Sequence, residues 1–129
     1  MTPPEIRYST RVIELFRTLP RAGALPAARG SIAVGEVVAL DRGAWVRFEA
    51  RVANGLIVDC RFQAWGCPHT LAAAALAAER LAGRRVGEGV DCEAASLARE
   101  LDAPAGKMGR LLAVEDAARA LLAEAAQVQ

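Results

Sequence analysis

The stretch FQAWGCPHT, residues 62–70, marks the point where a predicted strand passes into a predicted helix. The backbone turns at Gly66, and Cys67 stands where an alanine-rich helical run begins. Unpaired N–H groups and the dipole at a helix N-terminus stabilise a thiolate, so we expect Cys67 to have a lowered pKa. The only histidine of the chain, His69, follows two residues later. We therefore predict that any chemistry of this protein takes place at this corner.

Two predicted strands joined by a hairpin lead into the corner. Apolar residues occupy every second position of residues 44–52 and 58–64, which is the period of strands with one buried face. Asn54 and Gly55 lie between them and predict a tight turn, because both residue types tolerate positive φ. The inward face of the second of these strands is predicted to comprise Val58, Cys60, Phe62 and Ala64.

The N-terminal part of the chain predicts a helix, a loop and the first strand. A stripe with helical spacing ends at Pro20, and small turn-forming residues predict a loop over residues 20–31. Residues 32–40 favour a strand with a bulge at Gly35, and residues 41–43 predict the turn that follows. The three strands then form an antiparallel meander. The helical stripe comprises Tyr8, Val12, Leu15, Phe16 and Leu19.

The C-terminal half is predicted to be helical. One helix ends near Gly83, a typical C-cap residue, and Asp91 is predicted to cap a shorter helix. Strands followed by helices in a single domain, residues 1–129, predict an α+β fold in which a three-stranded antiparallel sheet packs against helices in two layers. The predicted buried stripes are Leu71, Ala74, Ala75, Ala78 and Leu81 in the first long helix and Leu111, Val114, Ala118, Leu121 and Ala125 in the last.

The composition narrows the class of protein. The 129 residues are 53% hydrophobic and 24% charged with a net charge of +1, which favours a buried core and argues against nucleic-acid binding. Residues 1–5 lack a signal-peptide core, and the apolar runs are too short and broken to predict a membrane span. Three cysteines, an odd number, favour free thiols in a reducing compartment, so we expect a cytoplasmic protein.

Several motifs occur in an order and spacing that resemble a known family. They are Tyr8-Ser9, Pro20 and Gly23 around the first helix, residues 55–59 with Gly66 and Cys67 before the corner, and Lys107 and residues 115–117 at the last helix. This pattern resembles the iron–sulfur cluster assembly scaffolds, IscU and the N-terminal domain of NifU. The resemblance implies their α+β fold, a non-enzymatic role, binding of iron or an iron–sulfur cluster, sulfur acceptance at Cys67, and a cysteine desulfurase as partner.

The sequence departs from that family at the ligand positions. Family scaffolds present three cysteines at one end of the fold, and this chain retains only Cys67. The position of the first family cysteine corresponds to Asp41 or Arg42, and the family's histidine–cysteine pair before the last helix corresponds to Gly109 and Arg110. The family's motif for an Hsp70-type chaperone is eroded, with matches at Pro104 and Lys107 only, so that partner is weakly implied.

These departures leave several hypotheses open. Iron–sulfur clusters are usually held by four ligands, so Cys67 and His69 would need a homodimer to complete a set. A zinc-binding regulator using Cys67, His69 and Asp41 is an alternative, and a degenerate interaction module without metal is another. If Arg42 and Arg110 lie beside Cys67, they oppose an iron cation and favour an anion or a persulfide.

Other conspicuous residues have simpler interpretations. Cys60 is predicted to be a small core residue, and Cys92 a surface or half-buried residue at a helix start. Trp65 suits the core or its rim. His69 is either a neutral ligand or proton acceptor for Cys67, or a first-turn residue that faces solvent. No serine–histidine–acid set is evident, which disfavours hydrolase chemistry.

Overall fold

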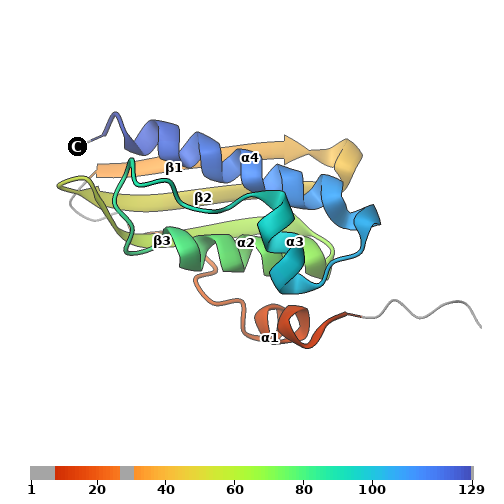
Figure 1. Ribbon diagram of the computed structural model, residues 1–129. Coiled ribbons are helices and arrows are strands. Elements are labelled where there is room, and N and C mark those ends of the chain that lie inside the picture. Colours follow the sequence, from red (N-terminus) through yellow and green to blue (C-terminus); the bar gives the residue numbers. More distant parts are fainter. Residues whose placement is uncertain (1–7, 27–30, 129) are drawn as a thin grey trace, which may run out of the picture.

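The computed structural model describes residues 8–26 and 31–128, and it confirms the predicted α+β architecture. A three-stranded antiparallel sheet has the order β1-β2-β3 (Figure 1). The expectations about residues 1–5 and part of the loop over residues 20–31 lie outside the described residues. The strands are β1 (Ser31–Ala39), β2 (Ala44–Ala53) and β3 (Leu56–Gly66).

Helices cover one face of this sheet (Figure 1). The fourth helix packs on β1 and β2 and the second helix on β3, while the first helix packs against the second. No helix in residues 8–26 or 31–128 combines the length and apolar character that a membrane crossing demands. The helices are α1 (Thr10–Thr18), α2 (Pro68–Leu81), α3 (Ala94–Leu101) and α4 (Met108–Ala125), with short 3-10 turns η1 (Leu40–Arg42) and η2 (Ala105–Lys107).

The β2–β3 hairpin contains the irregularity that the sequence did not reveal. Asn54 and Gly55 form the predicted turn with φ of 52° and 74°. The register shifts between Arg51 and Val52, so that Val52 pairs with Ile57. In consequence Ile57 is buried and Val58 is 47% exposed. The prediction that Val58 faces the core was therefore wrong, because strict alternation does not hold across a bulge.

Gly35 lies in regular pairing opposite Phe48, so the predicted bulge at this position is wrong. A Cβ atom at Gly35 would collide with the backbone of Ala117 and Leu121 in α4. The glycine instead allows α4 to approach β1 closely. A close approach of another backbone is, besides a bulge, a common reason for glycine inside a strand.

Two helices, α1 and α2, depart from the buried stripes that the sequence predicts. In α1, Val12 and Leu15 are buried, but Phe16 is 42% exposed because α1 packs against the rest of the molecule from one side only. In α2, the seven residues 72–78 are all buried, since the sheet and the other helices surround this helix. The predicted stripe was therefore too narrow, and its first member, Leu71, is only half-buried.

The start of α3 also differs from the prediction. The N-cap is Glu93, and Asp91 accepts a hydrogen bond of 3.2 Å from the backbone N–H of Glu93 just before the helix. Cys92 is 5% exposed and belongs to the core, which corrects its predicted place at or near the surface. Cys60, by contrast, is fully buried as predicted, and the five residues of the predicted stripe in α4 are buried as well.

Candidate functional site

Three segments that are distant in sequence meet at the right-hand end of the sheet in Figure 1. They are the turn after β1, the corner between β3 and α2, and the start of α4. Gly66 pairs with Ala44, and a Cβ atom on Gly66 would lie 2.8 Å from the carbonyl oxygen of Gly43. A Cβ atom on Gly43 would in turn lie 3.3 Å from the guanidinium of Arg110. The corner that carries Cys67 therefore adjoins the segments that carry Arg42 and Arg110.

Cys67 is the N-cap residue of α2, with extended backbone angles of −75° and 170°. Pro68 follows at the first helical position, where its fixed φ suits a helix start. The side chain is half-buried, and its Sγ atom lies 3.7 Å from the hydroxyl Oγ1 of Thr70. The corner thus holds a thiol at the N-terminus of a helix, where the first N–H groups have no partner within the helix.

The surroundings of Cys67 favour its ionised form. Burial raises the pKa of the Cys67 thiol, but hydrogen bonds from Thr70 and from the backbone of His69, together with the charge of Lys107, lower the pKa below its ordinary value. Burial raises the pKa of Cys60 and of Cys92 to about 12 each. Among the three cysteines, Cys67 is therefore the one whose surroundings favour the thiolate, the nucleophilic form of the side chain.

His69 points into the protein and not into solvent. Its side chain is fully buried, its ring centroid lies 5.0 Å from that of Tyr8, and neither ring nitrogen has a hydrogen-bond partner. Burial, followed by the charges of Lys107 and Arg110, lowers the pKa of His69 and keeps the ring neutral. The solvent-facing interpretation was wrong, and the neutral state agrees with the prediction.

Arg42 and Arg110 both lie near the start of α4. Arg42 donates to the carbonyl oxygen of Gly109 at 3.5 Å and forms an ion pair with Asp116 at 3.9 Å. The Nε atom of Arg110 is buried and has no hydrogen-bond partner. Of these two cations, Arg110 acts on the pKa of His69.

Lys107 belongs to this corner as well. It ends η2, is half-buried, and its charge acts on both Cys67 and His69. Pro104 is the exposed residue just before η2, and Asp41 is exposed in η1. Lys107 was predicted only as a partner-binding residue, because its distance in sequence from Cys67 hid this proximity.

The described residues of one chain do not form a metal site. Within residues 8–26 and 31–128, no three histidine, cysteine, aspartate or glutamate side chains lie close enough together to hold a metal ion. Cys67, His69 and Asp41 are therefore not gathered into one ligand set. A single half-buried thiol does not by itself fit an iron–sulfur cluster, which usually takes four ligands.

Sequence reasoning missed Thr70. This residue is fully buried and contacts the Cys67 thiol. The spacing from Cys67 to Thr70 is that from the N-cap to the third helical residue, the pair that faces each other in a capping box. This spacing is the feature of the sequence that could have identified Thr70 as a neighbour of the Cys67 thiol. Trp65, also at this corner, is 59% exposed and so lies at the rim rather than in the core.

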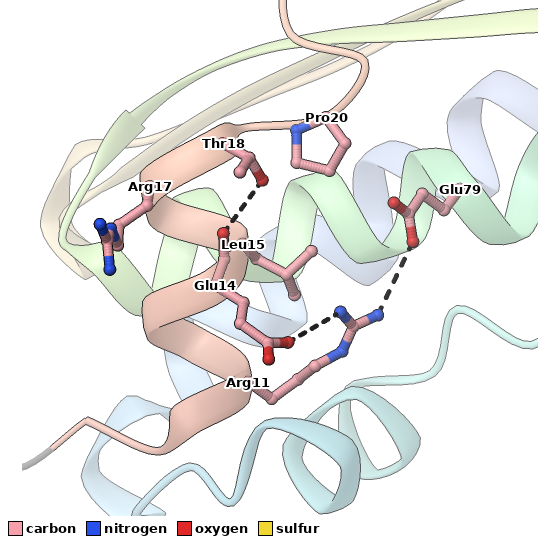
Figure 2. A pocket seen from close by; sticks show the side chains of 7 residues that line it. All are labelled: Arg11, Glu14, Leu15, Arg17, Thr18, Pro20 and Glu79. Carbon is pink, nitrogen blue, oxygen red and sulfur yellow. Dashed lines mark hydrogen bonds and ion pairs between the residues drawn. The ribbon is translucent and has the colours of Figure 1, made fainter.

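A cavity of about 520 Å³ lies elsewhere, between α1 and α2 (Figure 2). Its charged groups neutralise one another: Arg11 forms ion pairs with Glu14 at 3.6 Å and Glu79 at 3.7 Å. Its lining contains neither cysteine nor histidine. The reactions considered for the Cys67 corner need a thiol, so this cavity cannot carry them out.

Comparisons with known proteins point to one family. The family described as "NifU-like N terminal domain" matches residues 7–127. The iron–sulfur cluster assembly enzyme IscU of Drosophila melanogaster is 30% identical, over 94% of this chain and 79% of its own. The iron–sulfur cluster assembly scaffold protein IscU of Azotobacter vinelandii is 31% identical, over 88% of this chain and 89% of its own.

Solved structures share the fold. The N-terminal part of a NifU-like protein from Brucella abortus has a TM-score of 0.55 and 21% identity, over 91% of this chain and 83% of its own. A putative iron–sulfur cluster assembly scaffold protein of the SUF system from Fervidobacterium islandicum has a TM-score of 0.56 and 16% identity, over 94% of this chain and 95% of its own. Both likenesses concern the fold alone.

Proposed function

Because the chain belongs to the NifU-like N-terminal domain family, we propose that it serves iron–sulfur cluster assembly as a scaffold-type protein that accepts sulfur at Cys67. The names of its bacterial relatives, which are called iron–sulfur cluster assembly scaffold proteins, support this role. Nothing in the comparisons favours a zinc-binding regulator or a degenerate interaction module. The role is that of a carrier and not of an enzyme.

One observation carries the proposal. Cys67 combines partial exposure with a lowered pKa, whereas burial raises the pKa of Cys60 and Cys92 to about 12. A thiolate is the nucleophile in sulfur exchange. A half-exposed thiolate at a strand-to-helix corner therefore suits attack on a sulfur donor.

The proposed partner is a cysteine desulfurase that carries sulfur as a cysteine persulfide. The Cys67 thiolate attacks the terminal sulfur of that persulfide. A new S–S bond forms on Cys67, the S–S bond of the donor breaks, and the donor cysteine leaves as a thiolate. The proton of the terminal sulfur stays with it or is lost to water, and no external oxidant is needed.

Iron–sulfur clusters enter as cargo and need further ligands. One chain contributes the Cys67 thiol, and its described residues hold no group of three metal-ligating side chains. We infer that iron is bound only where a second copy or a partner protein supplies the remaining ligands. An Hsp70-type chaperone is a weaker proposal, supported by the exposed Pro104 and the half-buried Lys107, the two residues that match the family's chaperone motif. The three free cysteines support a reducing, cytoplasmic location.

The test is persulfide formation on the purified chain in the presence of a cysteine desulfurase and cysteine. Mass spectrometry of the intact protein is expected to detect one added sulfur atom, localised to Cys67. Cys67→Ser is expected to abolish the addition, while Cys60→Ala and Cys92→Ala retain it. Undiminished sulfur uptake by Cys67→Ser would overturn the proposal.

A further inference from the structure

We propose that the edge of strand β3 next to the Cys67 corner binds an extended, apolar peptide segment of a partner protein, which adds to the sheet as a further strand at Ala64. The proposal goes beyond the proposed function and requires neither iron nor sulfur transfer. The sheet has the order β1-β2-β3, so one side of β3 borders no further strand of the sheet in the described part of the chain. The N–H and C=O groups along such an edge can pair with another chain.

The chain itself covers much of this edge. Near the start of β3, the N–H of Ile57 donates to the carbonyl oxygen of Arg84 at 2.8 Å, and its carbonyl oxygen accepts from the N–H of Gly83 at 2.7 Å. Further along the strand, the N–H of Cys60 donates to the side chain of Asp59 at 2.8 Å. These bonds satisfy backbone groups of the edge and protect it from other chains, as native sheets commonly do.

A short extended segment covers the edge at Phe62. The N–H of Phe62 donates to the carbonyl oxygen of Arg21 at 2.9 Å, and its carbonyl oxygen accepts from the N–H of Gly23 at 2.8 Å. Ala22 thereby forms a parallel bridge with Phe62. The chain then leaves the edge, since Gly23 has a φ of 117° and the N–H of Leu25 donates to a glutamate side chain of β2. The edge therefore accepts an extended backbone, but the chain's own segment stops short of Ala64.

Ala64 is the next position whose backbone groups face outward. In an antiparallel pair these groups alternate between the two sides of a strand, so the N–H and C=O groups of Ala64 point away from β2, as those of Phe62 do. The segments that pair with Ile57 and Phe62 provide no partner for the N–H of Ala64. Ala64 is only partly buried. The edge therefore offers one donor and one acceptor to an added strand, close in sequence to Cys67.

A hollow of about 270 Å³ lies at this part of the edge, between β3, the end of α1 with the loop after it, and the start of α2. Its volume is below the roughly 300–1,000 Å³ of small-molecule pockets, so it suits a protruding side chain of an added strand better than a free ligand. None of the described residues that line it is charged, so it favours an apolar side chain. The apolar residues of its lining are Leu19, Ala22, Trp45, Phe62, Ala64 and Leu71.

The occupant is a peptide segment of a partner and not a second copy of the folded chain. The segments at Ile57 and Phe62 block the rest of the edge, so the β3 strand of a second copy cannot pair along it. At the other edge of the sheet, the N–H of Val34 donates to the side chain of Glu124 at 3.2 Å, and α4 packs on β1. A short extended segment fits the remaining positions: main-chain hydrogen bonds hold it, and the hollow selects its side chain.

The experiment adds a synthetic peptide, SVLVS with blocked ends, to the isotope-labelled native chain and follows the backbone amides by NMR. We expect the amide proton of Ala64 to shift downfield and its hydrogen exchange to slow by roughly tenfold at saturation, because it gains a hydrogen-bond partner. The same peptide with every amide N-methylated cannot donate to the edge and should cause no shift. A peptide with aspartate in place of leucine should bind more weakly by roughly tenfold, because the hollow would have to bury a charge.

Matched variants of the chain test the edge and the hollow separately. Ala64→Pro removes the N–H at a position where a strand edge tolerates proline, and it should abolish the peptide-induced shifts of Gln63 and Leu71. Leu71→Asp places a charge in the lining and should weaken binding by roughly tenfold. Leu112→Asp introduces the same charge at an exposed position of α4 outside the hollow and should leave binding unchanged. If thermal unfolding shows that Ala64→Pro does not fold, Leu71→Asp and the N-methylated peptide decide.

Three outcomes would overturn the inference: an unchanged Ala64 amide at millimolar peptide, equal binding of the N-methylated peptide, or shifts confined to other surfaces. Movement of the Ala64 signal when the chain is concentrated without peptide would show pairing between copies, and it would overturn the choice of occupant. None of these measurements involves a desulfurase. Their failure therefore leaves sulfur acceptance at Cys67 to be decided by its own test.

Discussion

The Sγ atom of Cys67 lies 3.7 Å from the Oγ1 atom of Thr70 at the N-terminus of α2. The contact links the N-cap residue to the third helical residue and holds the thiol over the free N–H groups of the helix. Backbone N–H groups of Thr70 and His69 also act on the thiol, so the pKa of Cys67 falls in spite of burial. This one turn of helix makes Cys67 chemically different from the other two cysteines.

The first prediction concerns thiol reactivity. Iodoacetamide at neutral pH is expected to alkylate Cys67 alone, because burial raises the pKa of Cys60 and Cys92 to about 12 and shields their sulfur atoms. Peptide mapping by mass spectrometry measures the modification at each site, and the urea-unfolded chain is the control in which all three react. Equal labelling of Cys60 and Cys67 in the native protein would contradict the assignment.

A second prediction concerns acid sensitivity. Burial and the charges of Lys107 and Arg110 lower the pKa of His69, so the unfolded chain binds its proton more readily than the folded chain. Stability is therefore retained above the unfolded pKa and is lost as the pH falls below it, by at most about 1.4 kcal/mol per pH unit for one group.

His69→Phe should reduce this dependence. Urea unfolding at pH 7 and pH 5 gives the difference in free energy of unfolding for each chain. Because His69 is the only histidine, a smaller difference in the variant reports on this residue. Any loss of packing in the variant affects both pH values alike, so identical pH slopes in the two chains would speak against a depressed pKa.

The bulge in β3 leads to a third prediction. Ile57 is fully buried and the adjacent Val58 is 47% exposed. Ile57→Ala should lower the free energy of unfolding by about 2–5 kcal/mol, whereas Val58→Ala should change it by less than about 1 kcal/mol. Chemical denaturation measures both. A larger effect at Val58 would mean that the strand follows strict alternation and that the register differs from the one described.

The fourth prediction tests the close approach of β1 and α4. Gly35→Ala places a methyl group against the backbone of Ala117 and Leu121, and should cost about 2 kcal/mol or more. Gly106→Ala is the matched control, because a Cβ atom there meets nothing within 4 Å. Thermal unfolding of both variants gives the comparison. Equal stability of the two would show that α4 has room to move away from the sheet.

Much of the architecture followed from local patterns. The alternation in β2, the Asn54-Gly55 turn and the apolar stripe in α4 each predicted the element that the structure contains. The place of Cys67 at the start of α2 was predicted in the same way. These are short-range properties, because periodicity, turn residues and caps act within a few neighbours along the chain.

The errors arose where contacts between elements decide burial. Gly35 serves the packing of α4, and the exposure of Phe16 depends on which side of α1 meets the rest of the molecule. Cys92 and His69 are buried because other elements pack over them. The residue types cysteine and histidine do not by themselves predict that burial. The bulge before Val58 likewise depends on the pairing with β2.

The amino-acid sequence by itself determined the order of strands and helices and the presence of a single activated thiol at a strand-to-helix corner. Only the tertiary structure decided which groups surround that thiol. Lys107 and Arg110 are distant from Cys67 along the chain, and they reach this end of the sheet because α4 packs across β1 and β2. Local propensity determines the elements, whereas long-range packing brings charges together and thereby determines the chemistry that the corner supports.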